Sequence, residues 1–433
     1  MKRKKTKRPN RPVWYIFGFI VVVLTLLFRK VKIVFKCSDG TILEGLEAKK
    51  KLLAFSPPYI IVGNHHSIYD HIYLIRAFFP RRINFIVARK HWLASKYLFF
   101  VRFARTIPKS LFQPDLQTVR GSFDVISNKG ILALYPEGQI VINGISKDMP
   151  ESCSKLIKKA KLPVFVIKSS GNYLCDNPWR KNLCNGIINL EISVALTPEE
   201  IEKTDVEEID KIIAKSIYVD SFAEQERTGW LYKGHNRAEG LTNILYMCPC
   251  CKKELTLKTK GNDIFCTECG TRAEYTETGH LDWKTGKSYF KHIGLWYNYQ
   301  RDTEKSRHIT EKNFDLQIPV KLAVLSASET KLADNEFKVK KTKGIEKAGD
   351  GILHLTEKGY TYMGKIFREE TLIHFDPSLL RYIPFTPGSN FQIYLQDVMF
   401  AFFTKDPRMC AKVALVIETY NELLSETHQV AAS

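Results

Sequence analysis

Two pairs of cysteines constrain this sequence more than any other feature. Each pair has the spacing Cys-x2-Cys and fourteen residues separate the pairs, which consist of Cys248, Cys251, Cys266 and Cys269. Two such turns supply four thiolates in a tetrahedron, the usual arrangement of a structural zinc site with no open position for catalysis. Residues 255–258 and 263–265 are expected to form strands of this zinc ribbon. Iron is the main competing metal, and Cys250 is not expected to be a ligand.

Length and charge bound the number of domains and the class of partner. With 433 residues, the chain is longer than one ordinary domain, so two or three are expected. The formal net charge of +19 favours anionic partners, namely phospholipid headgroups, nucleic acid or phosphorylated small molecules. The remaining cysteines are scattered, which indicates a reducing compartment rather than a disulfide framework.

A basic N-terminus precedes an apolar run. The first twelve residues hold seven lysines and arginines and no acid, and the apolar run covers residues 13–28. A signal peptide has a similar pattern, but no small-residue cleavage site follows, so we expect an uncleaved membrane anchor. The run has 16 residues, a little fewer than the ~17–25 that span a bilayer. A full span and a half-inserted helix therefore both stay open, with a buried core helix as the simpler alternative.

The rest of the chain divides into an α/β part and a β-rich part. Apolar runs at 59–62, 84–88, 131–135 and 163–168 are expected to be strands, with helices at 67–79, 115–128 and 200–217 between and after them. The expected domains are a basic N-terminus with an anchor helix at 1–30, an α/β domain at 31–221, a connector at 222–245, the zinc ribbon at 246–275 and a small β-rich domain with a closing helix at 276–433.

A histidine and an aspartate five residues apart follow the first of these strands. On a regular helix the side chains of His65 and Asp70 would point about 140° apart. They can meet only if His65 lies in the loop before the helix and Asp70 in its first turn. A histidine is the natural general base near neutral pH, and a carboxylate on its other nitrogen fixes the tautomer. A simpler alternative is a helix start at Ser67 with ordinary loop hydrogen bonds.

Two further segments carry polar side chains beside predicted strands. Glu137 and Gly138 follow the strand at 131–135, where a carboxylate beside a glycine turn suits a substrate hydroxyl or phosphate. An ordinary turn is the alternative, because Pro and Gly occur in loops of every kind. Arg105 and Lys109 offer two cations near an apolar stretch, either as a phosphate site or as a solvated basic face.

Taken together, these segments resemble the glycerolipid acyltransferase family, which includes the 1-acylglycerol-3-phosphate acyltransferases. The similarity covers about residues 40–220 and consists of Asn64-His65-x-Ser67-x-x-Asp70, the basic block ending at Lys109, Tyr135-Pro136-Glu137-Gly138 and the strand start at Leu162-Pro163-Val164, in that order.

The resemblance implies an acyltransferase of phospholipid biosynthesis. His65 would be the general base and Asp70 its orienting partner, without a metal in the chemistry. The implied substrate-binding residues are Lys109 and Arg105 for the acceptor phosphate, Glu137 and Gly138 for the acceptor, and Asn64 and Ser67 from the motif. The donor would be acyl-CoA or acyl-carrier protein, and the acceptor a lysophospholipid such as lysophosphatidic acid. The enzyme would lie on the cell membrane with its catalytic domain on the cytoplasmic side.

Two departures from the family pattern put lysophosphatidic acid in doubt. Gln139 and the two apolar residues after it stand where the family often has Thr-Arg-Ser, and Lys109 stands where arginine is usual. The rival hypothesis is a membrane-tethered zinc-ribbon protein that binds nucleic acid or protein and has a degenerate acyltransferase-like domain. Nucleic acid is not the expected partner, because base-stacking aromatics are not evident around the ribbon.

Overall fold

The fold is that of a computed structural model of the chain. It describes residues 5–94, 98–111, 115–147, 149, 153–311, 314–332, 338–380 and 382–432, so Lys2, Arg3 and Lys4 of the basic N-terminus lie outside it. The chain divides into two compact units. The N-terminal unit comprises Met1–Pro178, Asn182–Gly234 and Glu277–Gly279, and the C-terminal unit comprises Trp179–Lys181, His235–Thr276 and His280–Ser433.

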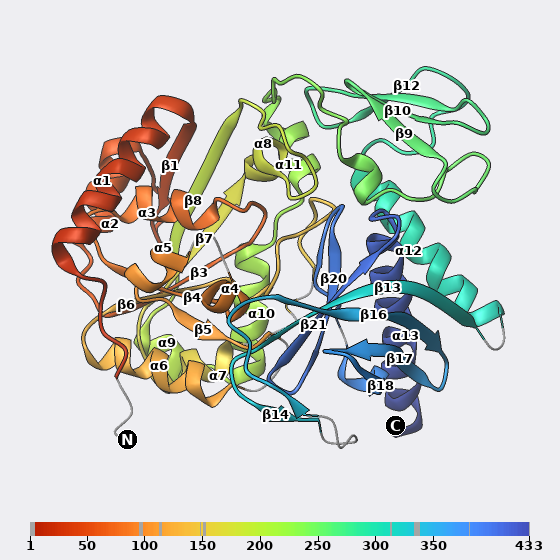
Figure 1. The fold of residues 1–433 in the computed structure, drawn as a ribbon. Helices are drawn as coiled ribbons and strands as arrows, with labels where there is room; N and C mark the ends of the chain where they lie inside the picture. Colours follow the sequence, from red (N-terminus) through yellow and green to blue (C-terminus); the bar gives the residue numbers. More distant parts are fainter. Residues whose placement is uncertain are drawn as a thin grey trace. The chain divides into compact units, whose positions relative to one another are not determined.

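An eight-stranded mixed sheet forms the centre of the N-terminal unit (Figure 1), with the strand order β2-β1-β8-β7-β3-β6-β4-β5. The strands are β1 (Lys30–Lys36), β2 (Ile42–Glu44), β3 (Tyr59–Gly63), β4 (Ile83–Ala88), β5 (Ile107–Lys109), β6 (Ile131–Leu134), β7 (Val164–Ser170) and β8 (Ile187–Leu196). Strands β7, β3, β6, β4 and β5 run parallel to their neighbours in this series. Their carboxyl ends therefore meet at one edge of the sheet.

Helices cover both faces of this sheet. They are α1 (Arg11–Phe28), α2 (Gly45–Ala54), α3 (Asp70–Phe78), α4 (Lys90–Ala94), α5 (Leu98–Phe103), α6 (Leu116–Ser127), α7 (Ser154–Ala160), α8 (Asn172–Asp176), α9 (Pro198–Lys203), α10 (Val206–Ile217) and α11 (Ser221–Thr228). Apolar side chains of α6, α7, α9 and α10 pack on Ile60 and Val62 of β3 from one face. Phe55 and Phe78 pack on Phe165 from the other, so the unit has three layers.

Helix α1 packs along its length on the rest of the N-terminal unit. Its buried residues are Trp14, Gly18, Val21 and Thr25, which share one face of the helix, and it contacts α3. The guanidinium of Arg76 donates a 2.7 Å hydrogen bond to the carbonyl of Thr25. The opposite face carries exposed apolar side chains, including Ile16, Phe19, Leu24 and Leu27. By length and composition, α1 is apolar enough to cross a membrane, but one face is occupied by protein.

The C-terminal unit holds a four-stranded ribbon, a seven-stranded sheet and a two-stranded hairpin. The ribbon comprises β9 (Leu257–Lys260), β10 (Asp263–Cys266), β11 (Arg272–Tyr275) and β12 (Leu281–Trp283). After α12 (Ile293–Thr310), a seven-stranded antiparallel sheet has the order β18-β17-β16-β13-β21-β20-β19, and a separate hairpin pairs β14 (Thr330–Lys331) with β15 (Lys338–Val339). The seven strands are β13 (Asp315–Ser326), β16 (Glu346–Thr356), β17 (Gly359–Ile366), β18 (Glu369–Phe375), β19 (Phe385–Thr386), β20 (Asn390–Leu395) and β21 (Val398–Thr404).

Helix α13 (Met409–Ala432) closes the seven-stranded sheet, as expected. Its side chains Cys410, Val413, Ala414 and Ile417 join the core formed by that sheet. The ribbon and this sheet belong to one compact unit. The finer domain boundaries expected at 221, 245 and 275 stay predictions.

The local structure differs from expectation in two places. The single helix expected at 200–217 is wrong, because two helices occupy this stretch. Helix α9 ends at Lys203, and Asp205 caps the start of α10 by accepting a 2.7 Å hydrogen bond from the backbone of Glu208. The connector expected from residue 222 onward begins inside another helix, α11, which Asp220 caps in the same way.

The packing of α1 gives the first prediction. A Cβ atom at Gly18 would lie 2.5 Å from the ring of Phe79, so Gly18→Leu is expected to overpack this contact. We expect the free energy of unfolding in detergent micelles, measured by chemical denaturation, to fall by about 1–3 kcal/mol. Ile16→Phe adds bulk to the exposed face of the same helix and serves as the control. An equal loss in both variants would contradict the packed orientation of α1.

Candidate active site and metal centre

The loops that follow four parallel strands lie at one edge of the N-terminal sheet. Val62 of β3 pairs with Leu134 of β6, and Phe85 of β4 pairs with Ala133 of β6. This register brings the loop that begins at Asn64 beside the loop that begins at Tyr135. The predicted His-Asp motif and the predicted Glu-Gly turn are thus neighbours, although about seventy residues separate them in sequence.

His65 and Asp70 meet as the sequence predicted. His65 lies in the loop after β3, α3 begins at Asp70, and the two atoms His65 Nδ1 and Asp70 Oδ2 are 2.9 Å apart. Because a carboxylate oxygen can only accept, Nδ1 carries the proton and Nε2 is the ring's lone-pair nitrogen. The His65 side chain is 22% exposed and that of Asp70 only 1%. Among the described residues, His65 Nε2 has no hydrogen-bond partner.

Asp70 is fixed by two further donors. Its Oδ2 also accepts from the backbone N–H of Ser67 at 2.9 Å, and its Oδ1 accepts from the amide of Asn172 at 2.7 Å. The bond from Ser67 is the helix-start contact that the sequence offered as an alternative to a catalytic role. One carboxylate therefore makes both the contact with the backbone of Ser67 and the contact with His65.

The neighbouring turn holds His65 from the other side. The backbone N–H of His65 donates to Glu137 Oε2 at 2.5 Å, and the backbone N–H of Val141 donates to the His65 carbonyl at 2.9 Å. The imidazole stacks on the ring of Tyr135 with centroids 4.7 Å apart. Gly138 has φ of +70°, a conformation that suits glycine, and this lets the turn place Glu137 beneath His65.

Asn64 and Ser67 are fully buried and engaged with the protein. The amide of Asn64 exchanges two hydrogen bonds with the backbone of Ser169 on β7, at 2.9 and 2.7 Å. The hydroxyl of Ser67 accepts from the backbone N–H of Tyr69. In this structure both residues position the loop, and their predicted contact with substrate stays a prediction.

The two predicted cations lie at different edges of the sheet. Lys109 ends β5 and pairs with Ala88 at the end of β4, so it lies at the carboxyl edge. Arg105 precedes β5, and its carbonyl accepts from Asn84 near the start of β4. The fold therefore brings Lys109, but not Arg105, to the edge that holds His65.

Sequence analysis missed a basic group at the end of β4. Lys90 and His91 follow this strand at the same carboxyl edge, as the first residues of α4. Desolvation by the surrounding protein lowers the pKa of His91 to about 4, although its side chain is exposed. The positive charges of Lys90, His71 and His65 lower this pKa further. Lys90, His71 and His65 are therefore within electrostatic range of His91. The rule that singled out His65 and Glu137, a polar residue directly after a buried strand, would have found them.

Burial shifts the other titratable groups around His65. It lowers the pKa of both His66 and His71 to about 4, and that of Lys90 to about 8. It raises the pKa of Glu137 to about 7. His66 is held between the hydroxyls of Ser146 and Ser221 at 3.0 and 3.1 Å, which suits a neutral imidazole.

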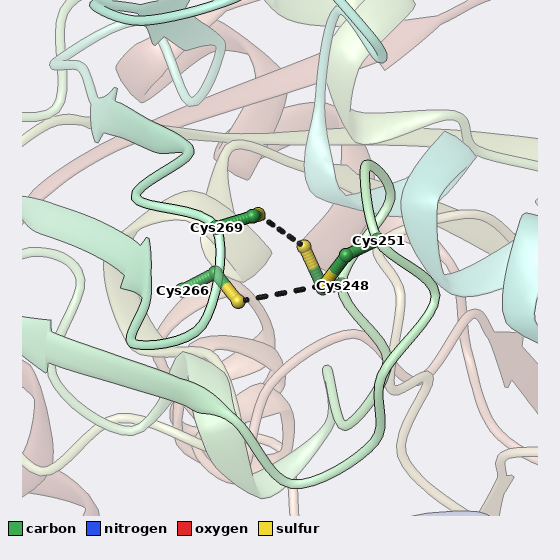
Figure 2. Close-up of side chains that lie close together, drawn as sticks. All are labelled: Cys248, Cys251, Cys266 and Cys269. Atoms are coloured by element: carbon green, nitrogen blue, oxygen red, sulfur yellow. Dashed lines mark hydrogen bonds between the residues drawn. The ribbon is translucent and has the colours of Figure 1, made fainter.

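The four paired cysteines converge in the C-terminal unit. Figure 2 shows their side chains pointing toward one another, and all four Sγ atoms lie within 4.8 Å. The Cys248–Cys269 and Cys251–Cys266 sulfur pairs are 3.7 and 3.8 Å apart. A metal about 2.3 Å from each of four tetrahedral sulfurs requires sulfur pairs about 3.8 Å apart. This group could therefore hold a metal ion, and the identity of the metal stays a prediction.

Both cysteine turns have the geometry of metal-binding loops. The residues that follow them, Lys252 and Gly270, have φ of +60° and +71°, and each donates its backbone N–H to the carbonyl of the first cysteine of its turn. The hydroxyls of Thr256 and Thr271 lie 3.3 and 3.2 Å from the sulfurs of Cys266 and Cys269. Such contacts orient thiolate ligands. A bound metal would hold the two loops together, and its four protein ligands leave no position for a substrate.

Among solved structures, the chain is distantly similar to the 1-acyl-sn-glycerophosphate (LPA) acyltransferase PlsC from Thermotoga maritima. The TM-score is 0.39 with 16% sequence identity, over 50% of this chain and 79% of that chain. No family model matches the chain, and no curated protein matches it. The function proposed below therefore rests on the side-chain geometry.

The raised pKa of Glu137 predicts a pH-dependent stability. Its pKa is about 7 in the folded chain against 4.5 as a reference, so the folded state binds the proton more tightly. The stability that this proton contributes is present below pH 4.5 and is lost as the pH rises through 7. Glu137→Gln cannot ionise. We therefore expect its free energy of unfolding to exceed that of the parent by an amount that grows as the pH rises between these limits and reaches about 1–3 kcal/mol.

Chemical denaturation at a series of pH values measures this gain. His66 has the opposite effect, because its lowered pKa makes stability fall as the pH drops from 6.5 toward 4. Since His66 Nε2 lies 3.9 Å from Glu137 Oε1, the two proteins are compared above pH 6.5, where His66 is neutral in both. Glu207→Gln on the exposed side of α10 is the control. A difference between Glu137→Gln and the parent that does not change with pH would contradict the shift.

The cysteine geometry predicts one metal per chain. We expect elemental analysis of the purified chain to find about one equivalent of zinc, and Cys251→Ser or Cys266→Ser to lose it. Cys250→Ser, at an exposed cysteine in the same loop, is the matched control and should keep the metal. Iron in place of zinc would overturn the choice of metal, and retention of metal by the first two variants would overturn the site.

Proposed function

We propose that this chain is an acyltransferase that moves a fatty acyl group from acyl-CoA or acyl-carrier protein to a glycerolipid hydroxyl. The single observation that carries the proposal is the 2.9 Å contact of His65 Nδ1 with a buried aspartate, at the carboxyl edge of a parallel sheet. The neighbouring Glu137 and Tyr135 orient the histidine and support this role.

The reaction follows from the protonation of His65. With the proton on Nδ1 held by Asp70, Nε2 takes the proton from the acceptor hydroxyl as its oxygen attacks the thioester carbonyl. The imidazolium that forms is stabilised by the Asp70 carboxylate. Collapse of the tetrahedral intermediate breaks the carbon–sulfur bond, and the proton on Nε2 passes to the leaving thiolate. The products are an ester and a free thiol, and His65 returns to its starting state.

The acceptor's phosphate would bind at the cationic side of this edge. Lys109 and Lys90 end or follow neighbouring strands there, and His91 lies beside them. Lysine contacts a phosphate as a point charge rather than as a bidentate fork. A lysophospholipid such as lysophosphatidic acid fits these charges. Arg105 lies at the opposite edge, and Gln139 carries no charge. Lys90 would therefore supply the cation for the acceptor phosphate that these two positions do not.

The exposed apolar face of α1 supports a membrane location. An 18-residue helix is about 27 Å long, just short of the roughly 30 Å of a bilayer core. Since its other face packs on α3, a helix half-inserted in one leaflet fits better than a full span. The thioester donors are cytosolic, so the catalytic unit would lie on the cytoplasmic face of the cell membrane, where phospholipid is synthesised.

An acyl-transfer assay tests the proposal. Detergent-solubilised protein would receive radiolabelled acyl-CoA or acyl-carrier protein and a panel of lysophospholipids and lipid alcohols. We expect transfer, and a loss of about 100- to 10,000-fold in kcat/KM for His65→Ala because the general base is removed. Asp70→Asn should lose a comparable factor, because an amide does not hold the productive tautomer.

The control is His374→Ala, which removes an exposed histidine from the C-terminal unit. Equal activity in His65→Ala and the parent would exclude the general-base role. A folded, metal-loaded chain that transfers to no acceptor would favour the rival function, a membrane-tethered binding protein that uses its ribbon.

A further inference from the structure

A lysine-rich segment lies on the surface of the C-terminal unit. Residues 338–347, here called the lysine segment, hold five lysines and one acid, Glu346. The five, all exposed, are Lys338, Lys340, Lys341, Lys343 and Lys347. The carboxylate of Glu346 accepts a 2.8 Å hydrogen bond from the backbone N–H of Lys343. Glu346 therefore stabilises the backbone of the segment in addition to contributing a negative charge.

Buried residues between the lysines fix this segment in place. The side chain of Val339, between Lys338 and Lys340, is fully buried in the core of the seven-stranded sheet. The hydroxyl of Thr342 accepts a 2.9 Å hydrogen bond from the backbone of Ser326, and the backbone N–H of Thr342 donates to the Ser326 carbonyl at 3.0 Å. The lysines therefore point outward from a segment that the fold holds, unlike those of a free tail.

A second turn places apolar side chains beside these cations. The backbone N–H of Phe367, in the β17–β18 turn, donates to the carbonyl of Ala348 at 2.7 Å, directly after Lys347. Phe367 is 37% exposed, and Ile345 within the lysine segment is 47% exposed. Arg368, next to Phe367, is exposed and adds another cation. One surface thus combines lysines and an arginine with two exposed apolar side chains, and the exposed acids Glu369 and Glu370 border it.

Four lysines of this surface have no ion-pair partner among the described residues. These are Lys340, Lys341, Lys343 and Lys347. Lysine ammonium groups attract an anionic bilayer without fixed geometry, and apolar side chains between them can enter the headgroup region. A nucleic-acid groove would instead align several aromatic side chains for base stacking, whereas the exposed apolar side chains described on this surface are the aliphatic Ile345 and one aromatic, Phe367.

We propose that the lysine segment and the adjoining β17–β18 turn form a second membrane-contact surface, which binds anionic phospholipid headgroups. This surface belongs to the C-terminal unit alone and does not depend on acyl transfer by the N-terminal unit. The cations hold the bilayer electrostatically, and Ile345 and Phe367 contact its interface.

Vesicle co-sedimentation of the full chain tests this proposal. The chain would be mixed with vesicles of phosphatidylcholine alone or with about 30% phosphatidylglycerol, and the ratio of the two partition coefficients measured. Helix α1 and the basic N-terminus contribute to both the parent and the variants. In Lys340→Gln/Lys341→Gln/Lys343→Gln we expect the partition onto anionic vesicles to fall about 10- to 100-fold and the partition onto neutral vesicles to stay unchanged.

A matched variant removes the same charge elsewhere in the C-terminal unit. Lys258→Gln/Lys260→Gln/Lys358→Gln changes three exposed lysines of β9 and the β16–β17 turn, and should keep the anionic preference. Ile345→Ser provides an independent variant, which should weaken binding to anionic vesicles without a change in charge.

Three results would overturn the proposal. They are an unchanged ratio in the triple variant, an equal fall in the matched variant, and a selective loss of binding to a short duplex DNA with vesicle binding intact. The last result would assign the surface to nucleic acid. Thermal denaturation of each variant shows whether the unit is folded, and Ile345→Ser keeps the test valid if the triple variant is not.

Discussion

The carboxylate of Asp70 is the contact on which the candidate active site depends. It joins His65 and Ser67 of the loop after β3 to Asn172 at the start of α8, which follows β7. Because the group is buried, its loss would leave polar donors on two segments without a partner, which costs more than the bonds themselves contribute. The position of His65 is therefore a tertiary property, fixed by two strands and the helix that begins at Asp70.

Local signals predicted the parts of this site that lie within a few residues of a strand end. The pairing of His65 with Asp70, the cysteine turns and four of the eight strands of the α/β unit follow from spacing and apolar runs. The break between α9 and α10 was also local, since Asp205 is a good helix cap, but the apolar periodicity on both sides concealed it.

The remaining features depend on contacts that the sequence does not display. The pairing of β1 with β8 joins residues about 160 positions apart, and no pattern in either strand indicates its partner. Arg105 and Lys109 look equivalent as a basic block, yet the three-residue strand β5 between them puts them at opposite edges. The burial of Glu137 is likewise a result of packing, so its raised pKa could not be read from the motif.

The pKa shifts around His65 have a common effect on the proposed reaction. His66, His71 and His91 are neutral at pH 7 because their pKa values are about 4. Neutral imidazoles add no positive charge beside His65. Lys90 is the exception, and its lowered pKa of about 8 still leaves it mainly charged for a phosphate. Burial thus removes the positive charge of His66 and His71 near His65 and leaves Lys90 as a cation of this edge.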